Sequence, residues 1–266
     1  MFPEPCDQLR AYTLGQLQRA ITCLTWRGSR AHQGVHQARK SMRRVRACLA
    51  LGKSALGAGA NMLDRELSKI CDGLSAVRDA QARVESLDRL LTGNAESEIR
   101  SCLVSAKRLA MKARADAMRN EQADDPYFLT RRERLQVLIA AIPVLPWNHI
   151  NVNALTDAVQ CTLQACDQAA ETALKRGREK DWHRLRRRRR RMAQQQTALE
   201  QSAIVLPKLE IPDRKLGELL GQAQDLSVLR EFFRKHPGLS PENGRQLLAF
   251  LKDEFTHLSE EAMASG

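Results

Sequence analysis

The chain has 266 residues, 43% of them apolar, and its 43 Lys and Arg against 31 Asp and Glu give a formal net charge of +12. A chain of this length and apolar content buries a hydrophobic core, which excludes an intrinsically disordered protein. The N-terminus lacks a basic region followed by an apolar core, and the longest apolar stretch, 137–147, contains two prolines. We therefore expect no signal peptide, no membrane span and a cytoplasmic protein.

The sequence predicts an all-α protein. Strand-length runs of β-branched or aromatic residues are scarce, whereas apolar residues recur with helical spacing from end to end. In chain order, the expected helices cover 6–27, 35–54, 61–73, 77–92, 94–121, 127–141, 152–177, 181–202, 213–223, 226–236 and 241–259. The breaks between them contain turn and cap residues. They include Gly34, the GAGAN of residues 57–61, 92–94, 125–126, 143–153, 206–212 and 236–238.

The chain also contains an internal repeat. His36 is followed by basic residues at +3, +4, +7 and +8, and His183, 147 residues later, opens the same pattern. Asp79 follows the first histidine by 43 residues, and Asp225 follows the second by 42. With a linker at 142–151, the repeat predicts a single domain over 1–266 built from two similar helical halves, 1–142 and 151–266.

The positive charge is concentrated near the two histidines. Residues 27–46 hold seven Lys and Arg without an acid, and 175–191 hold eleven against two acids, so the rest of the chain nets −4. On a helical wheel the basic residues of 35–51 form one arc with His36 at its centre, and apolar residues face the other way. The second helix repeats this arc, although Arg189 falls on its apolar side.

Such a helix is unfavourable without a compensating anion. The arginines of 184–191 form seven like-charge pairs at i,i+3 or i,i+4, which together cost about 1.5–3.5 kcal/mol. A solvated charged face is the alternative interpretation, but such faces usually mix both signs, and 182–199 contains no acid. The sequence therefore predicts a polyanion-binding site.

The residues alone leave the kind of polyanion open. Arginine forks match phosphate oxygens, so a linear phosphate polymer and a nucleic-acid backbone both fit. The absence of aromatic residues from 27–46 disfavours base stacking. A third hypothesis is a phosphohydrolase that uses His36 or His183.

We do not favour an enzyme, because neither histidine has a carboxylate at +3 or +4 or lies in an HExxH motif. The seven cysteines lack a CxxC pair, and we expect reduced thiols, no metal and no cofactor.

Four ordered segments resemble the CHAD family, the conserved histidine α-helical domain. VHQARKSMRRVRACLAL at 35–51 is similar to its signature, and WHRLRRRRRRM at 182–192 is similar to the motif of its second half. VRD at 77–79 and QDLSVL at 224–229 resemble two further elements. The resemblance implies two helical bundles related by a pseudo-twofold axis around a central basic pore or groove. It also implies non-catalytic binding of inorganic polyphosphate and association with polyphosphate granules.

The resemblance also assigns the candidate residues. The expected polyphosphate contacts are His36, Arg39, Arg43, Arg44, Arg46, His183, Arg186, Arg190 and Arg191, with Lys40 and Arg187 added by their wheel positions. A secondary basic set consists of Arg27, Arg30, Lys107, Arg108 and Arg114. We expect Asp79 and Asp225 to be structural, either orienting the basic helices or capping the helices that follow them. The ExExK strand motif of the triphosphate tunnel domain, a frequent fusion partner of the family, is absent, so we expect a stand-alone module.

Overall fold

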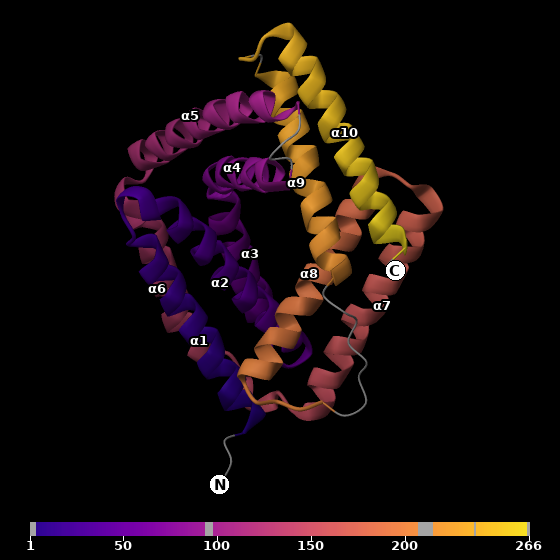
Figure 1. The fold of residues 1–266 in the computed structure, drawn as a ribbon. Helices are drawn as coiled ribbons and strands as arrows, with labels where there is room; N and C mark the ends of the chain where they lie inside the picture. Colours follow the sequence, from indigo (N-terminus) through magenta and orange to yellow (C-terminus); the bar gives the residue numbers. More distant parts are fainter. Residues whose placement is uncertain (1–3, 94–97, 207–214, 237, 265–266) are drawn as a thin grey trace. The chain divides into compact units, whose positions relative to one another are not determined.

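The structure is a computed structural model that describes residues 4–93, 98–206, 215–236 and 238–264. These residues form ten α-helices and four short 3-10 helices and include no β-strand, which confirms the predicted all-α class (Figure 1). The α-helices are α1 (Pro5–Leu24), α2 (Ala31–Leu51), α3 (Lys53–Gly73), α4 (Ser75–Gly93), α5 (Arg100–Asp124), α6 (Leu129–Ala141), α7 (Val152–Arg176), α8 (Glu179–Gln201), α9 (Lys215–Lys235) and α10 (Pro241–Ala264). The 3-10 helices are η1 (Gly28–Arg30), η2 (Pro126–Phe128), η3 (Ile142–Val144) and η4 (Trp147–His149).

The helices fall into two compact units. Unit 1 comprises Met1–Ser75 and Asp124–Pro212, with α1, α2, α3, α6, α7 and α8, whereas unit 2 comprises Ala76–Ala123 and Asp213–Gly266, with α4, α5, α9 and α10. Each unit therefore draws helices from both predicted halves. The division into compact units does not test whether the sequence is duplicated. The halves 1–142 and 151–266 therefore stay a prediction. Both histidine-bearing helices, α2 and α8, belong to unit 1.

Helix α2 lies at the centre of the contacts within unit 1. It packs against α1, α3, α7 and α8, while α7 also pairs with α8 and α6 packs on α1. These contacts bury an apolar stripe of α2, in which Val35, Ala38, Met42 and Val45 are fully buried. Burial of this stripe fixes the rotation of α2 about its axis and hence the direction in which its basic residues point.

The predicted linker at 142–151 is a packed connection inside unit 1. Ile142, Trp147 and Ile150 are buried, and the indole Nε1 of Trp147 donates a hydrogen bond to the Ile142 carbonyl at 2.7 Å. The segment contacts α1 and α3 through its two 3-10 helices. Its prolines interrupt the α-helices as expected, but its apolar side chains belong to the core.

Several predicted breaks are wrong. Gly34 lies inside α2, and α9 continues without interruption through residues 224–225, where two helices were expected. Gly57 is in the left-handed region with a φ of +65°, so the chain does kink at GAGAN, but helix α3 begins before it, at Lys53. Parts of the breaks predicted at 206–212 and 236–238, and the helix starts predicted at 94 and 213, lie outside the described residues.

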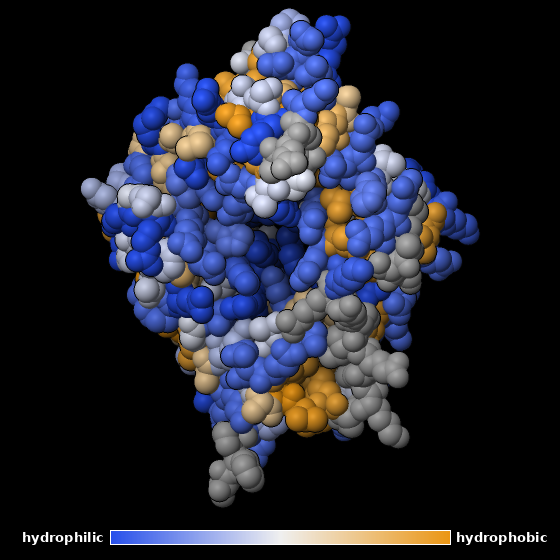
Figure 2. Space-filling view, in the orientation of Figure 1, coloured by the Kyte–Doolittle hydropathy of each residue, from blue (hydrophilic) through white to orange (hydrophobic). Residues whose placement is uncertain are grey.

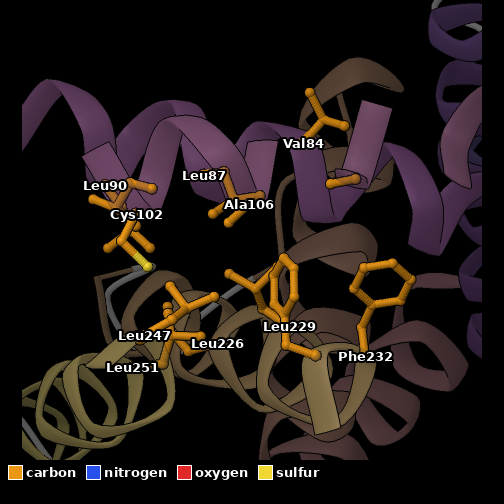
Figure 3. Packing of buried hydrophobic residues seen from close by; sticks show 13 residues of the cluster. Val84, Leu87, Leu90, Cys102, Ala106, Leu226, Leu229, Phe232, Leu247 and Leu251 are labelled. Carbon is orange, nitrogen blue, oxygen red and sulfur yellow. The ribbon is translucent and has the colours of Figure 1, made fainter. Parts of the chain in front are cut away.

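Unit 2 has its own hydrophobic core. Leu87 and Ala106, from α4 and α5, are fully buried, as are Leu229 of α9 and Leu251 of α10. Figure 3 shows the side chains of α4 and α5 pointing toward those of α9 and α10. All four helices of the unit therefore meet at one core.

Hydrophilic residues cover most of the face in the space-filling view, and hydrophobic residues occur in separate groups (Figure 2). Among the helices of the described segments, none has both the length and the apolar content that a bilayer-crossing helix needs.

Gly34 provides a test of the crossing between α1 and α2. A Cβ atom at this position would lie 2.3 Å from the backbone oxygen of Cys23 in α1. Because this is a backbone atom, the clash can be relieved only if α1 moves away from α2. We therefore expect Gly34→Ala to lower the free energy of unfolding by about 1–3 kcal/mol. This loss outweighs the intrinsic helix preference of alanine over glycine, which is about 1 kcal/mol.

Gly15, in the interior of α1, is the matched control because a Cβ there meets no atom within 4 Å. Gly15→Ala should raise the free energy of unfolding by about 0.5–1 kcal/mol. Urea denaturation followed by circular dichroism measures both variants. A Gly34→Ala protein as stable as the wild type would contradict the close approach of the two helices.

Candidate functional site

The basic residues of α2 lie on the side of the helix away from its buried apolar stripe. His36, Arg39, Arg43, Arg44 and Arg46 are half-buried, and Lys40 is exposed. The wheel places these basic residues opposite the stripe, but Ala47 and Leu51, which fall within the same arc, are also buried. These cations form two overlapping groups, because the charge of Arg43 acts both on Lys40 and on Cys71 of α3.

One group, called here the cation cluster, consists of Lys40 and the three cations whose charges act on it: Arg43 and Arg44 of α2 and Arg19 of α1. Arg44 Nη1 donates to Gln16 Oε1 of α1 at 3.3 Å. The pKa of Lys40 is lowered, first by partial burial and then by the positive charges of Arg44, Arg19 and Arg43. Every charge that contributes to this shift is positive, so an anion bound here would relieve the repulsion. Arg19 was missed in the sequence because nothing in the pattern of α1 connects it with α2.

The second group of α2 faces α3. The Nε and Nη2 of Arg46 donate to Asp64 Oδ1 and Oδ2, at 2.7 and 3.2 Å. Burial opposes the charge of Arg46, but these hydrogen bonds and the charge of Asp64 outweigh it, and the pKa of Arg46 is raised. Cys71 lies near the same cations: burial raises the pKa of its thiol, and Arg39, Arg43 and Arg46 oppose the increase. This side of α2 therefore combines arginines with an acid that the sequence analysis did not identify.

Helix α8 packs against both α2 and α7. Leu185 and Met192 are buried, whereas Arg187 is exposed and His183, Arg186, Arg190 and Arg191 are half-buried. Burial lowers the pKa of Arg191; the charge of Asp64 opposes this shift, and Arg46 and Arg188 add to it. Arg191 is therefore close enough to the Arg46–Asp64 pair to interact with it, which connects the basic sides of α2 and α8 within one unit.

The first turn of α8 carries the acids that its arginine run lacks. Glu179 and Asp181 lie there, where negative charge is favourable because of the helix dipole. Asp181 is buried and accepts a hydrogen bond from Arg178 Nε at 2.8 Å, which lowers the pKa of its carboxyl group. These groups stabilise the start of a helix whose later arginines repel one another.

The two histidines occupy similar environments on their helices. Both are half-buried and interact with other groups of the protein. Across the described ranges, no group of three or more His, Cys, Asp or Glu side chains is arranged to hold a metal ion. The six cysteines other than the exposed Cys161 are buried or half-buried, and all seven are free thiols, as expected.

The secondary basic set is divided between the units. In unit 1, the guanidinium groups of Arg27 and Arg30 lie over the rings of Tyr127 and Trp26, at 4.1 and 4.3 Å. The other three residues belong to unit 2. Lys107 pairs with Asp88 at 2.5 Å, Arg114 Nη1 donates to Gln81 Oε1 at 3.1 Å, and Arg108 lines a surface depression beside Lys107.

Asp79 and Asp225 come together in unit 2. Asp79 lies within α4 and Asp225 in the middle of α9, so neither caps the start of a helix. Arg78 pairs with both, at 3.2 Å to Asp79 Oδ1 and 3.6 Å to Asp225 Oδ1, and Arg89 Nη2 lies 3.8 Å from Asp225 Oδ2. The two repeat-related aspartates therefore share an arginine and link α4 to α9.

Taken together, these features define an all-helical protein in which two arginine-rich helices pack against each other. Residues 11–234 match the model of the CHAD domain family, and the chain belongs to that family. PptA from Streptomyces chartreusis has a similar fold, with a TM-score of 0.68 and 18% identity over 99% of this chain and 98% of that one. The CHAD domain from the plant Ricinus communis gives a TM-score of 0.66 and 17% identity over 98% of this chain and 90% of that one. No curated protein sequence matches this chain.

Proposed function

We propose that this protein binds inorganic polyphosphate without chemically altering it. The observation that carries the proposal is the cation cluster of Arg19, Lys40, Arg43 and Arg44, in which the charges acting on Lys40 are all positive. Membership of the CHAD family, which is associated with polyphosphate binding, supports the same ligand. We further propose that binding recruits the protein to polyphosphate granules in the cytoplasm.

The proposed contacts are charge-assisted hydrogen bonds from two helices. The donors on α2 are His36, Arg39, Lys40, Arg43 and Arg44, and those on α8 are His183, Arg186, Arg187, Arg190 and Arg191. Guanidinium forks bind phosphate oxygens in pairs, and each phosphate that is neutralised releases counterions. A chain long enough to reach several cations gains affinity by effective concentration, which a short one does not.

A nucleic-acid backbone is the rival ligand. The observation that favours it is the pair of arginines that lie over aromatic rings at the entry to α2, where Tyr127 is 54% exposed. Aromatic rings and arginine planes of this kind stack on bases. Polyphosphate has no bases and gains nothing from these rings, so the two ligands are distinguishable in solution.

The test is a parallel titration of long-chain polyphosphate, tripolyphosphate and single-stranded RNA at several salt concentrations. We expect the dissociation constant, expressed per ligand molecule, to fall as the phosphate chain lengthens. The affinity for long polyphosphate should also decrease by powers of ten between low and moderate salt. RNA that binds as tightly as polyphosphate at moderate salt would contradict the proposal, and so would phosphate release that is lost in His36→Ala.

A further inference from the structure

Asp64 of α3 lies beside cations of both basic helices. Its carboxylate accepts the two hydrogen bonds from Arg46 of α2, and its charge also acts on Arg191 of α8. The side chains of Arg46 and Asp64 are 24% and 32% exposed, so solvent reaches the pair only partly. A negative charge next to a polyanion-binding surface repels the ligand, and this one also occupies a guanidinium group.

The geometry of the Arg46–Asp64 pair determines which hydrogen-bond donors of Arg46 remain available to a ligand. A guanidinium fork binds a carboxylate and a phosphate in the same two-pronged way. Because Asp64 already occupies the Nε and Nη2 edge of Arg46, a phosphate using that edge would first have to displace the carboxylate. Displacement leaves a partly buried aspartate without this partner, which is costly.

We propose that Asp64 is an internal counter-ion that withholds Arg46 from the ligand and so limits the number of cations that α2 presents to polyphosphate. The proposal rests on the polyphosphate-binding function proposed above. It changes the part played by Arg46, which the family resemblance assigned to the ligand. Arg46 instead joins α2 to α3, and Asp64 is a positioning residue that sets the affinity of the neighbouring site.

The test is Asp64→Asn, which keeps the shape of the side chain but removes its charge and frees the Arg46 fork. We expect long-chain polyphosphate to bind more tightly, by roughly threefold to tenfold at low salt. The slope of log affinity against log salt should become steeper by roughly 0.7–0.9, which corresponds to one additional phosphate contact. A purely structural role for Asp64 would lower the unfolding midpoint without changing this slope.

Two further variants separate the release of Arg46 from the change in net charge. Asp72→Asn removes a charge from the same helix that also acts on Arg46. Asp72 accepts its hydrogen bond from Ser68 Oγ at 3.4 Å, whereas the Nε and Nη2 of Arg46 donate to Asp64. This variant therefore frees no Arg46 donor, and we expect the wild-type slope. The double variant Asp64→Asn/Arg46→Gln should also return to the wild-type slope, because the freed cation is gone. An unchanged slope in Asp64→Asn, or a slope that stays steep in the double variant, would overturn the inference. A wild-type protein that does not bind polyphosphate would instead overturn the proposed function.

Discussion

Arg43→Gln and Arg190→Gln should each weaken the binding of long-chain polyphosphate by roughly tenfold to a hundredfold. The two arginines occupy equivalent positions, seven residues after His36 and after His183, one on each basic helix. A hydrogen bond that involves a charged group contributes about 1.5–3 kcal/mol, and each 1.4 kcal/mol changes a dissociation constant about tenfold. If one ligand contacts both helices at independent points, the losses multiply, and the double variant should bind roughly 100- to 10,000-fold more weakly.

Isothermal titration calorimetry at fixed salt measures this prediction. Arg119→Gln is the control, because Arg119 in α5 is 72% exposed, pairs with Asp116 and lies in unit 2. The control removes the same charge and should change the affinity by less than about twofold. Both site arginines are half-buried and interact with other groups, so circular dichroism must show that the variants remain folded. Folded single variants that bind like the wild type would exclude these two helices as the binding site.

Most of the helical framework follows from the sequence because it depends on local rules. The apolar stripe and turn residues predicted α8 over 181–202, and the helix runs over Glu179–Gln201. Local rules fail where a residue serves a distant contact. Gly34 resembled a helix break, but it lies inside α2, where the absence of a side chain lets α1 approach closely. The continuity of α9 was missed for a similar reason, since Asp225 resembled a cap and instead pairs with arginines of α4.

The candidate site, too, could be predicted only as far as it depends on local rules. A helical wheel places the arginines of α2 on one side, because that arrangement depends only on spacing within the helix. The wheel does not reveal which of these arginines interact with a residue of another helix. Asp64 follows Arg46 by 18 residues on a separate helix, and the charge of Arg19 on α1 acts on Lys40. Both interactions depend on how helices pack, which a single sequence without homologues does not encode in a local pattern.

Trp147→Ala should be among the most destabilising single substitutions in the chain, lowering the free energy of unfolding by about 3–5 kcal/mol. Trp147 is 2% exposed, and its indole donates to the Ile142 carbonyl at 2.7 Å. Its 3-10 helix contacts α1 and α3, so truncation leaves a cavity among the helices that support α2. The substitution also removes the hydrogen-bond donor to a carbonyl of a buried residue. For a protein with ordinary stability of about 5–15 kcal/mol, this loss is a large part of the total.

Val144→Ala is the matched control, because Val144 belongs to the same connecting segment but is 83% exposed. It should change the free energy of unfolding by less than about 0.5 kcal/mol. Trp147→Phe keeps most of the apolar volume and loses the donor, so its cost should be intermediate, about 1–3 kcal/mol. Urea denaturation followed by far-ultraviolet circular dichroism ranks the three variants without depending on tryptophan fluorescence. If Trp147→Ala proved no more costly than Val144→Ala, residues 142–151 would behave as the simple linker that their prolines suggest, and the packing of this segment against α1 and α3 would be wrong.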